Sequence, residues 1–498
     1  MREYLRVTPT SERLNPERLP QALESLHKLT SADSPGLADK LNPLHSETPL
    51  RFEFLAFSEG ADDPVEFYYG ADDHLDTLEK RLRSIYPETF DIERTEVDVA
   101  SRLVQPVEFD RETFVDQYES GELMYEFGPA EHYERGTDDN GQAEPADAES
   151  VADGGAVGDL SADHIIEVGD TALELAPPDA VPTDEPLTTL AKPTVTAEGR
   201  ILARPATETV SPLGVRWQGS AARKQDWMTS LSPVTADDDE AELPAVNQPG
   251  GALASLVDHL MEATAPVAFQ VVFQRRESWQ SDADLRKEDV IDGRDTLAQE
   301  IIGSLFELDD QSESRDRNQL SDAVAKRVAA IEAKNPKRSF TANIRAIGIP
   351  SGDEGRGDLD ERMQSLVPVF DPLDGPYYQV TAERVRDGGF RAATKERNAR
   401  AALQRLLDRE ITTGRGKTRP EFVLSGRELA HFVLVPSSEQ LTVEGARGTR
   451  AEQQSRNPLP RPHQDLMSEF RDGMAIGYAL DDTGEAEDEP THIPPRLL

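Results

Sequence analysis

The alternation of apolar and polar positions in residues 50–99 predicts a compact β-β-α-β unit. Apolar residues alternate with polar ones in the stretch that begins at Arg51, as they do along a strand with one buried face. Leu75, Leu78 and Leu82 recur at helical spacing. The expected elements are strands at 51–57 and 65–69, a helix at 74–85 and a strand at 90–97. A short amphipathic helix at 17–29 precedes the unit.

A second α+β pattern runs through residues 188–435. Val267 to Phe273 carries apolar residues on both faces, which is typical of a strand in the middle of a sheet. The expected elements are helices at 252–261, 297–305, 324–331 and 361–368, strands at 267–273, 340–347 and 377–385, and an acidic turn at 351–360. Because the element order is similar to that of the first unit, we interpret this region as a degenerate repeat of it.

These patterns predict an α+β protein with two domains, each an antiparallel sheet with helices and each leaning toward a ferredoxin-like fold. The two domains are separated by a long acidic, Pro- and Gly-rich stretch, whose composition predicts a disordered linker. The expected parts are an N-terminal domain at 1–130, the linker at 131–187, the second domain at 188–435, and a linker with strands at 436–498.

The chain is strongly acidic, with 95 Asp and Glu against 53 Lys and Arg and a net charge of −42. The acids are spread over the whole chain, which favours adaptation to high salt, where screening removes self-repulsion. A largely disordered acidic protein is the alternative, and an apolar content of 37% argues against it.

The absence of cysteine excludes disulfides, thiolate catalysis and Cys-ligated zinc. No signal sequence or membrane-spanning run is present, so we expect a cytoplasmic protein of a halophile.

A basic island reverses this charge locally between residues 384 and 419. Its main candidates for a contact surface are Arg391, Lys395, Arg397, Arg400, Arg405, Arg409, Arg415 and Lys417. Such a surface could bind DNA phosphates or an acidic neighbouring domain. The alternative is a solvated helix face whose arginines pair with nearby acids.

The remaining motifs favour structure over catalysis. The triplet Gly416-Lys417-Thr418 lacks the glycine that a phosphate-binding loop needs five residues earlier, where Ile411 stands. The nine histidines lie at no metal-binding spacing. Ser425 and Glu428 match a helix capping box. We therefore expect no catalytic, cofactor-binding or metal-binding residues.

The order of elements near the C-terminal end resembles a segment of the HerA-like DNA-pumping ATPases, which include conjugative type IV secretion ATPases. The residues that carry it are Ser425 to Pro436, then Gly473 to Tyr478, then Thr491 to Leu498. In that family such elements lead directly to the glycine-rich nucleotide loop. Val267 to Phe273 and Phe340 to Ile347 resemble two further strands ahead of the motor.

The resemblance implies the non-catalytic N-terminal region of a haloarchaeal motor of this type, ending just before its nucleotide loop. Such a region would have no ATPase activity of its own and would act in assembly. Its partners would be an ATPase core, encoded separately or downstream, and further copies of itself, with DNA contact an open question. Contact with a membrane channel would come only through partners, which would place the protein at the membrane periphery. The alternative is a free-standing acidic scaffold or adaptor.

Overall fold

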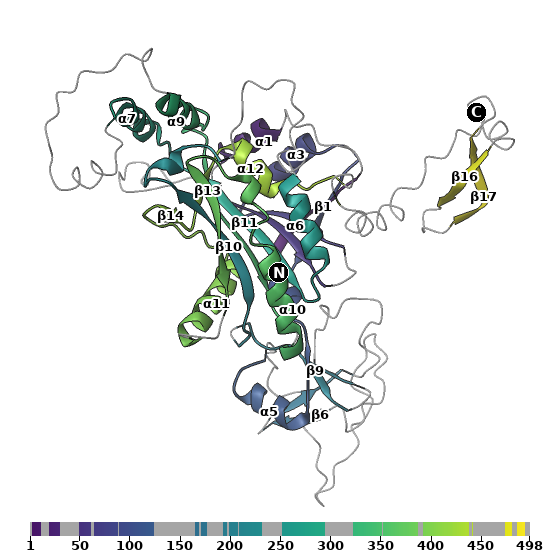
Figure 1. The fold of residues 1–498 in the computed structure, drawn as a ribbon. Coiled ribbons are helices and arrows are strands. Elements are labelled where there is room, and N and C mark those ends of the chain that lie inside the picture. The colour runs from purple at the N-terminus through teal and green to yellow at the C-terminus, as the bar shows by residue number, and fades with distance from the viewer. Residues whose placement is uncertain are drawn as a thin grey trace, which may run out of the picture.

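The computed structural model describes the chain in several stretches separated by gaps. They are residues 2–10, 19–29, 49–60, 64–87, 89–123, 165–168, 171–176, 193–196, 199–207, 209–231, 251–293, 322–350, 352–386, 392–437, 441, 474–480 and 486–493. Most of the described strands belong to one antiparallel sheet of ten strands (Figure 1).

The first half of this sheet is a β-α-β-β-α-β unit. Its elements are β1 (Arg2–Thr8), α1 (Leu19–Leu26), β2 (Arg51–Ser58), β3 (Glu66–Ala71), α3 (Leu75–Ile85) and β4 (Asp91–Val97). The strands lie in the order β2-β3-β1-β4, with all neighbours antiparallel. This element order and strand order are those of a ferredoxin-like fold, toward which the sequence pattern leans.

The second half repeats the same topology. Its elements are β10 (Leu213–Ala221), α6 (Gly251–Met261), β11 (Val267–Arg275), β12 (Phe340–Gly348), α10 (Gly352–Ser365) and β13 (Tyr378–Val385). The order β11-β12-β10-β13 matches that of the first half strand for strand. A helical insertion separates β11 from β12 and includes α7 (Gln280–Ile291) and α9 (Asp322–Glu332).

The two halves join edge to edge through an antiparallel pairing of β2 with β11. At its centre Leu55 lies opposite Gln270, and these two residues occupy equivalent places in the two repeats. The halves are therefore related by an approximate two-fold axis through this pair. The α+β class is confirmed, but the two expected sheets are one continuous sheet. Both β2 and β11 are buried on both faces because they lie at its centre.

Helices cover both faces of the sheet. One face packs against α1, α3, α6, α10 and α12 (Gly426–Val433) in a single large core, in which Phe54 of one half meets Phe269 of the other with ring centroids 6.3 Å apart. The opposite face packs against α4 (Val99–Leu103) and α11 (Ala392–Leu407). The short strands β14 (Thr418–Arg419) and β15 (Phe422–Leu424) pair with β10 and β12 respectively.

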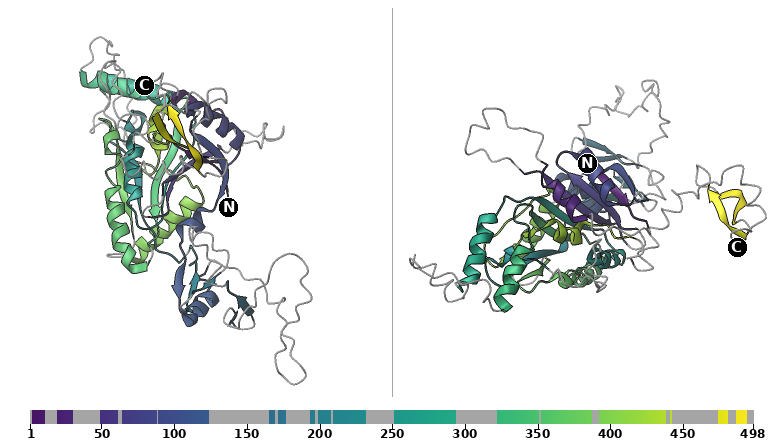
Figure 2. Two further views of the ribbon diagram at one scale, coloured as in Figure 1. Left: turned by 90° about the vertical axis from the view of Figure 1, so that its right-hand side faces the viewer. Right: turned by 90° about the horizontal axis from the view of Figure 1, so that it is seen from above.

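A smaller unit lies beyond the ends of the main strands (Figures 1 and 2). It contains the sheet β5 (Val107–Phe109), β9 (Ile201–Ala203) and β8 (Thr194–Val195), the helix α5 (Arg111–Glu119), and the hairpin β6 (Ile165–Val168) with β7 (Thr171–Glu174). Its core is separate and centres on Phe114. The hairpin β16 (Met474–Leu480) with β17 (Ala486–Ile493) completes the described strands.

Some elements differ from the sequence-based expectation. The strands β1 and β10 were not expected, although each lies inside the sheet between two neighbours. Residues 352–360 are the first part of α10 rather than an acidic turn. The glycines and acids of this segment obscure its helical pattern of apolar residues. Leu359 and Met363, at i,i+4 spacing, are nevertheless buried on one face of the helix. The helix expected at 297–305 and most of the 131–187 linker lie outside the described residues.

Candidate functional site

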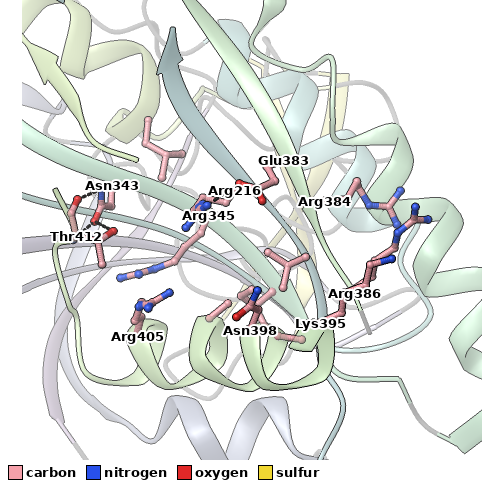
Figure 3. Close-up of a pocket in the computed structure, with 15 residues that line it drawn as sticks. Arg216, Asn343, Arg345, Glu383, Arg384, Arg386, Lys395, Asn398, Arg405 and Thr412 are labelled. Atoms are coloured by element: carbon pink, nitrogen blue, oxygen red, sulfur yellow. Dashed lines mark hydrogen bonds and ion pairs between the residues drawn. The ribbon is translucent and has the colours of Figure 1, made fainter. Parts of the chain in front are cut away.

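A basic cleft lies between α11 and the face of the sheet formed by β10, β12 and β13 (Figure 3). Its volume is about 490 Å³. We define the basic cleft by its six cationic lining residues, which are Arg216, Arg345, Arg384, Arg386, Lys395 and Arg405. The acidic residue in its lining is Glu383. In a chain with a net charge of −42, this cleft reverses the sign of the charge locally.

Two of the arginines come from neighbouring strands and lie directly opposite each other. Arg216 on β10 is the register partner of Arg345 on β12. Like charges in this position destabilise an antiparallel pair. Glu383, on the other side of Arg216, lies 2.5 Å from its Nη2 and offsets one of the two charges. Glu383 forms no ion pair with the second arginine, Arg345.

Arg345 is held by neutral groups. Its Nε donates to Gln270 Oε1 at 2.7 Å, and its Nη2 donates to the backbone carbonyl of Glu410 at 3.1 Å. Arg345 is only 5% exposed, and this burial lowers its pKa to about 10 although the charges of Glu53 and Glu410 act in the opposite direction. No hydrogen bond joins its Nη1 to any residue in the described ranges. Figure 3 shows the side chain reaching from the sheet toward α11.

The other side of the cleft carries Lys395 and Arg405 on α11. Arg405 lies 3.7 Å from the carboxylate of Glu410, while Arg384 pairs with Asp360 of α10. Burial lowers the pKa of Arg384. Within the described part of the chain, Arg386 and Lys395 form no ion pair. Six cations therefore face three carboxylates, those of Glu383, Asp360 and Glu410, and the cleft keeps an excess of about three positive charges.

The structure divides the predicted basic island into separate places. Lys395 and Arg405 line the cleft, whereas Arg397 is exposed on α11 and Arg400 pairs with Glu396 at 2.8 Å. Arg415 is exposed in the turn before β14. Lys417 is also exposed, and its Nζ donates to the carbonyl of Ala222 at 3.2 Å. Arg391 lies outside the described residues.

Arg409 is a buried structural residue and does not line the cleft. Its Nε lies 2.6 Å from Glu53 Oε2, and both side chains are almost fully buried. Glu53 also accepts hydrogen bonds from Tyr4 Oη at 2.8 Å and from Gln270 Nε2. Burial opposes the charged form of Arg409, but Glu53, Tyr4 and Asp72 together raise its pKa above the ordinary value. Since Gln270 also holds Arg345, this network connects the joint between the halves to the cleft.

The triplet Gly416-Lys417-Thr418 spans a bend and the first residue of β14. The N–H of Gly414, two residues before the triplet, donates to the carboxylate of Glu421 at 2.8 Å. A phosphate loop uses such backbone donors to bind an anion and then opens a helix. Here an internal acid occupies the donor and β14 follows, which is the geometry of a basic turn.

Ser425 and Glu428 form both hydrogen bonds of a capping box at the start of α12. Glu428 Oε1 also accepts from the N–H of Leu231 at 2.8 Å and lies 3.3 Å from Nζ of the buried Lys334. Burial lowers the pKa of Lys334, while Glu428 acts in the opposite direction. The pair is therefore part of the packing of the second half.

Sequence reasoning missed Arg216 and Arg345, the two residues at the centre of the cleft. Both interrupt apolar runs, in Val215-Arg216-Trp217 and in Ile344-Arg345-Ala346. A charged residue inside a central strand is rare unless it is paired. This signal could have identified them, but β10 itself was not expected.

Among the residues that the structure describes, no three His, Cys, Asp or Glu side chains converge to hold a metal ion. Across the same ranges no helix is both long enough and apolar enough to span a bilayer. No protein-family model, curated protein or solved structure matches the chain. The resemblance to HerA-like ATPases thus stays a prediction from the sequence.

Proposed function

We propose that this chain is the accessory, assembly region of a DNA-translocation or conjugative-transfer ATPase of a halophile. In this role it has no nucleotide-hydrolysing site of its own. It holds a motor, other copies of itself or both in position, and it works in the cytoplasm or at the membrane periphery through its partners. The observation that carries the proposal is the placement of α12, the element with the strongest resemblance to the ATPase family.

The helix α12 contacts both halves of the sheet. On one side it packs against α1 of the first half, and on the other against α6 of the second. At the end of the helix, Tyr69 Oη donates to the carbonyl of its last residue, Val433, and two residues further on the N–H of Val435 donates to Tyr86 Oη at 3.0 Å. At its start Glu428 binds the second half through Leu231.

This arrangement supports a mechanical role. In the ATPase family the equivalent segment leads toward the motor, so a motor attached there would act on both halves at once. A helix that is held at both ends by buried hydrogen bonds moves together with the sheet, because little of it can move independently. A displacement of a motor attached to α12 would therefore be passed on to both halves. The basic cleft adds a surface that can receive an anionic partner.

The proposal is tested by size-exclusion chromatography with light scattering in about 3 M KCl, which screens the self-repulsion of the chain. The protein is run alone and with a phosphate-loop ATPase encoded next to it. We expect co-elution as a stoichiometric complex or a ring. A lone monomer that does not bind the ATPase would overturn the proposal and favour the acidic scaffold.

A matched variant shows whether α12 forms the joint. Tyr86→Phe removes the hydrogen bonds of Tyr86 Oη to Val435 and to Tyr69 while keeping the ring. If α12 couples the sheet to the motor, the complex should weaken about three- to ten-fold, in line with the one buried hydrogen bond that reaches the end of α12. Tyr118→Phe, in the smaller unit, should leave the complex unchanged.

A further inference from the structure

We propose that the basic cleft binds a compact, phosphate-bearing small molecule of nucleotide size. The cleft would bind it whether or not the chain serves an ATPase, and without hydrolysing it. The inference starts from the unbalanced charge of the cleft. Arg386 and Lys395 at its rim have no ionic partner in the described ranges, and Arg345 at its floor is held by neutral groups.

The two arginines at the floor of the cleft repel each other and so destabilise the fold when no ligand is bound. Arg216 and Arg345 face each other across β10 and β12, and Glu383 forms an ion pair with Arg216 alone, while Glu53 and Glu410 act on Arg345 without an ion pair. The equivalent position to Arg345 in the first half is Tyr68, which lies opposite Arg6. The same topology therefore folds without a second arginine. An anion bound between the two guanidinium groups would remove the repulsion, which makes ligand binding the physical reason for the pair.

Fixed guanidinium groups favour phosphate over a single carboxylate. Each arginine offers a planar fork of N–H donors that matches two phosphate oxygens. Gln270 fixes the orientation of Arg345 at 2.7 Å, and Glu383 fixes that of Arg216 at 2.5 Å. Such preorganised donors lose little entropy on binding. Several phosphates in one ligand would contact the floor and the rim together, which helps binding survive high salt.

The size of the cleft selects a small ligand. Its volume of about 490 Å³ falls within the range of small-molecule pockets, roughly 300 to 1,000 Å³. A duplex could touch only the rim, because the floor lies between a helix and the sheet. Apolar side chains from Ile347, Ala399 and Ala402 line part of the cleft beside the arginines. This mixture of charged and apolar lining suits a phosphate group joined to a ring system, as in a nucleoside triphosphate.

The test measures binding of fluorescently labelled ATP to the full chain in KCl, by anisotropy. The cleft variant is Arg386→Glu with Lys395→Glu, since neither residue is needed for a described ion pair. The control variant is Arg397→Glu with Arg415→Glu, which changes the net charge equally but outside the cleft. We expect the cleft variant to lose at least about ten-fold in affinity and the control less than about two-fold, because direct charge-assisted contacts outweigh long-range charge.

Three outcomes would overturn the proposal. The first is no ATP binding by the wild-type chain, and the second is an equal loss in both variants. The third is displacement of ATP by single-stranded DNA with an efficiency that grows with length, or by polyglutamate at least as well as by unlabelled ATP. That result would assign the cleft to nucleic acid or to an acidic peptide. Displacement by unlabelled ATP and by tripolyphosphate, with circular dichroism unchanged in both variants, would support it.

Discussion

The two halves of the sheet share one topology but differ in how their polar faces are neutralised. A single row of register partners crosses all eight main strands and shows the difference. It reads Glu383, Arg216, Arg345, Gln270, Leu55, Tyr68, Arg6 and Glu93. Both ends carry a glutamate beside an arginine. In the second half that arginine faces Arg345, whereas in the first half it faces Tyr68.

The first half closes its polar face with matched charges. Arg102 of α4 stacks over Phe57, with the guanidinium carbon 4.2 Å from the ring centroid, and pairs with Glu59 at 2.6 Å and with Glu66. Arg6 lies 2.7 Å from the other oxygen of Glu66. Burial alone would raise the pKa of Glu66, but Arg102 and Arg6 lower it overall. A helix placed directly on the sheet therefore leaves little unpaired charge.

The second half keeps its polar face open. There α11 carries Lys395 and Arg405, which line the same cleft as four further arginines, and this cleft remains between the helix and the strands. The difference shows that two repeats can keep the same strand order while the charged side chains on one face of the sheet differ. On this face the first half pairs its charges, and the second accepts unfavourable charge of the kind that binding sites carry.

The largest expected effect is at the joint between the halves. Glu53→Gln removes the negative charge that pairs with Arg409 at 2.6 Å, while Glu53 is only 1% exposed. A buried arginine that keeps only Asp72, whose carboxylate lies 3.6 Å from its Nη1, should cost about 4 kcal/mol of the free energy of unfolding. Denaturant unfolding at constant KCl measures it. Glu396→Gln, which breaks the exposed pair with Arg400, is the control and should cost less than about 1 kcal/mol.

A double variant identifies the cause. Adding Arg409→Met to Glu53→Gln removes the buried charge that only Asp72 still pairs, so part of the lost stability should return. If the two substitutions are simply additive, then the charge pair is not what holds the joint. The comparison of the halves would then rest on the apolar contacts of β2 and β11 alone.

The second prediction compares one arginine from each half. Arg102→Met should destabilise the protein by about 3 kcal/mol, because Glu59 would be left largely buried without its cation and Glu66 would keep only Arg6. Arg345→Met should change stability by less than about 1 kcal/mol, because it removes a buried charge and the repulsion from Arg216. It should also abolish binding of ATP to the cleft. Thermal unfolding and anisotropy on the same samples measure both effects.

Equal destabilisation by the two substitutions would contradict this view of the halves. It would mean that Arg345 supports the fold as strongly as Arg102 does. The cleft would then be a structural arrangement of charges, since a residue kept for binding should be dispensable for folding.

Much of the fold could be predicted from the pattern of apolar positions. The strands at 51–57, 267–273 and 340–347 were expected within a few residues because apolar runs mark central strands. By contrast, β1 was missed because Arg2, Glu3 and Arg6 mask its buried Tyr4 and Leu5. The joining of the two sheets could not be predicted, since pairing between distant strands leaves no local signal.

Only part of the cleft could be predicted from the sequence. The island at 384–419 pointed to a basic surface, but a one-dimensional cluster mixes residues from the two faces of a helix and from separate turns. Arg409 belongs to the buried joint and Arg415 to an exposed turn. The two arginines on the floor of the cleft come from strands about 130 residues apart in the chain, and register alone brings them together.

The smallest expected effect concerns α12, the helix that both halves share. Burial lowers the pKa of His431 to about 4, and its Nδ1 has no hydrogen-bond partner among the described residues. The folded state therefore keeps this imidazole neutral, while the unfolded chain takes up a proton near pH 6.5. The contribution of His431 to the free energy of unfolding is fully present above pH 6.5 and is lost as the pH falls toward 4, by about 2 kcal/mol at pH 5.

His431→Gln cannot be protonated, so its free energy of unfolding should fall less between pH 7 and pH 5 than that of the wild type. Urea unfolding at both pH values and constant KCl measures the difference, and the carboxylates shared by both proteins cancel. Parallel pH profiles for the two proteins would show that α12 admits water and a proton at His431, and that it is a looser link between the halves than its packing indicates.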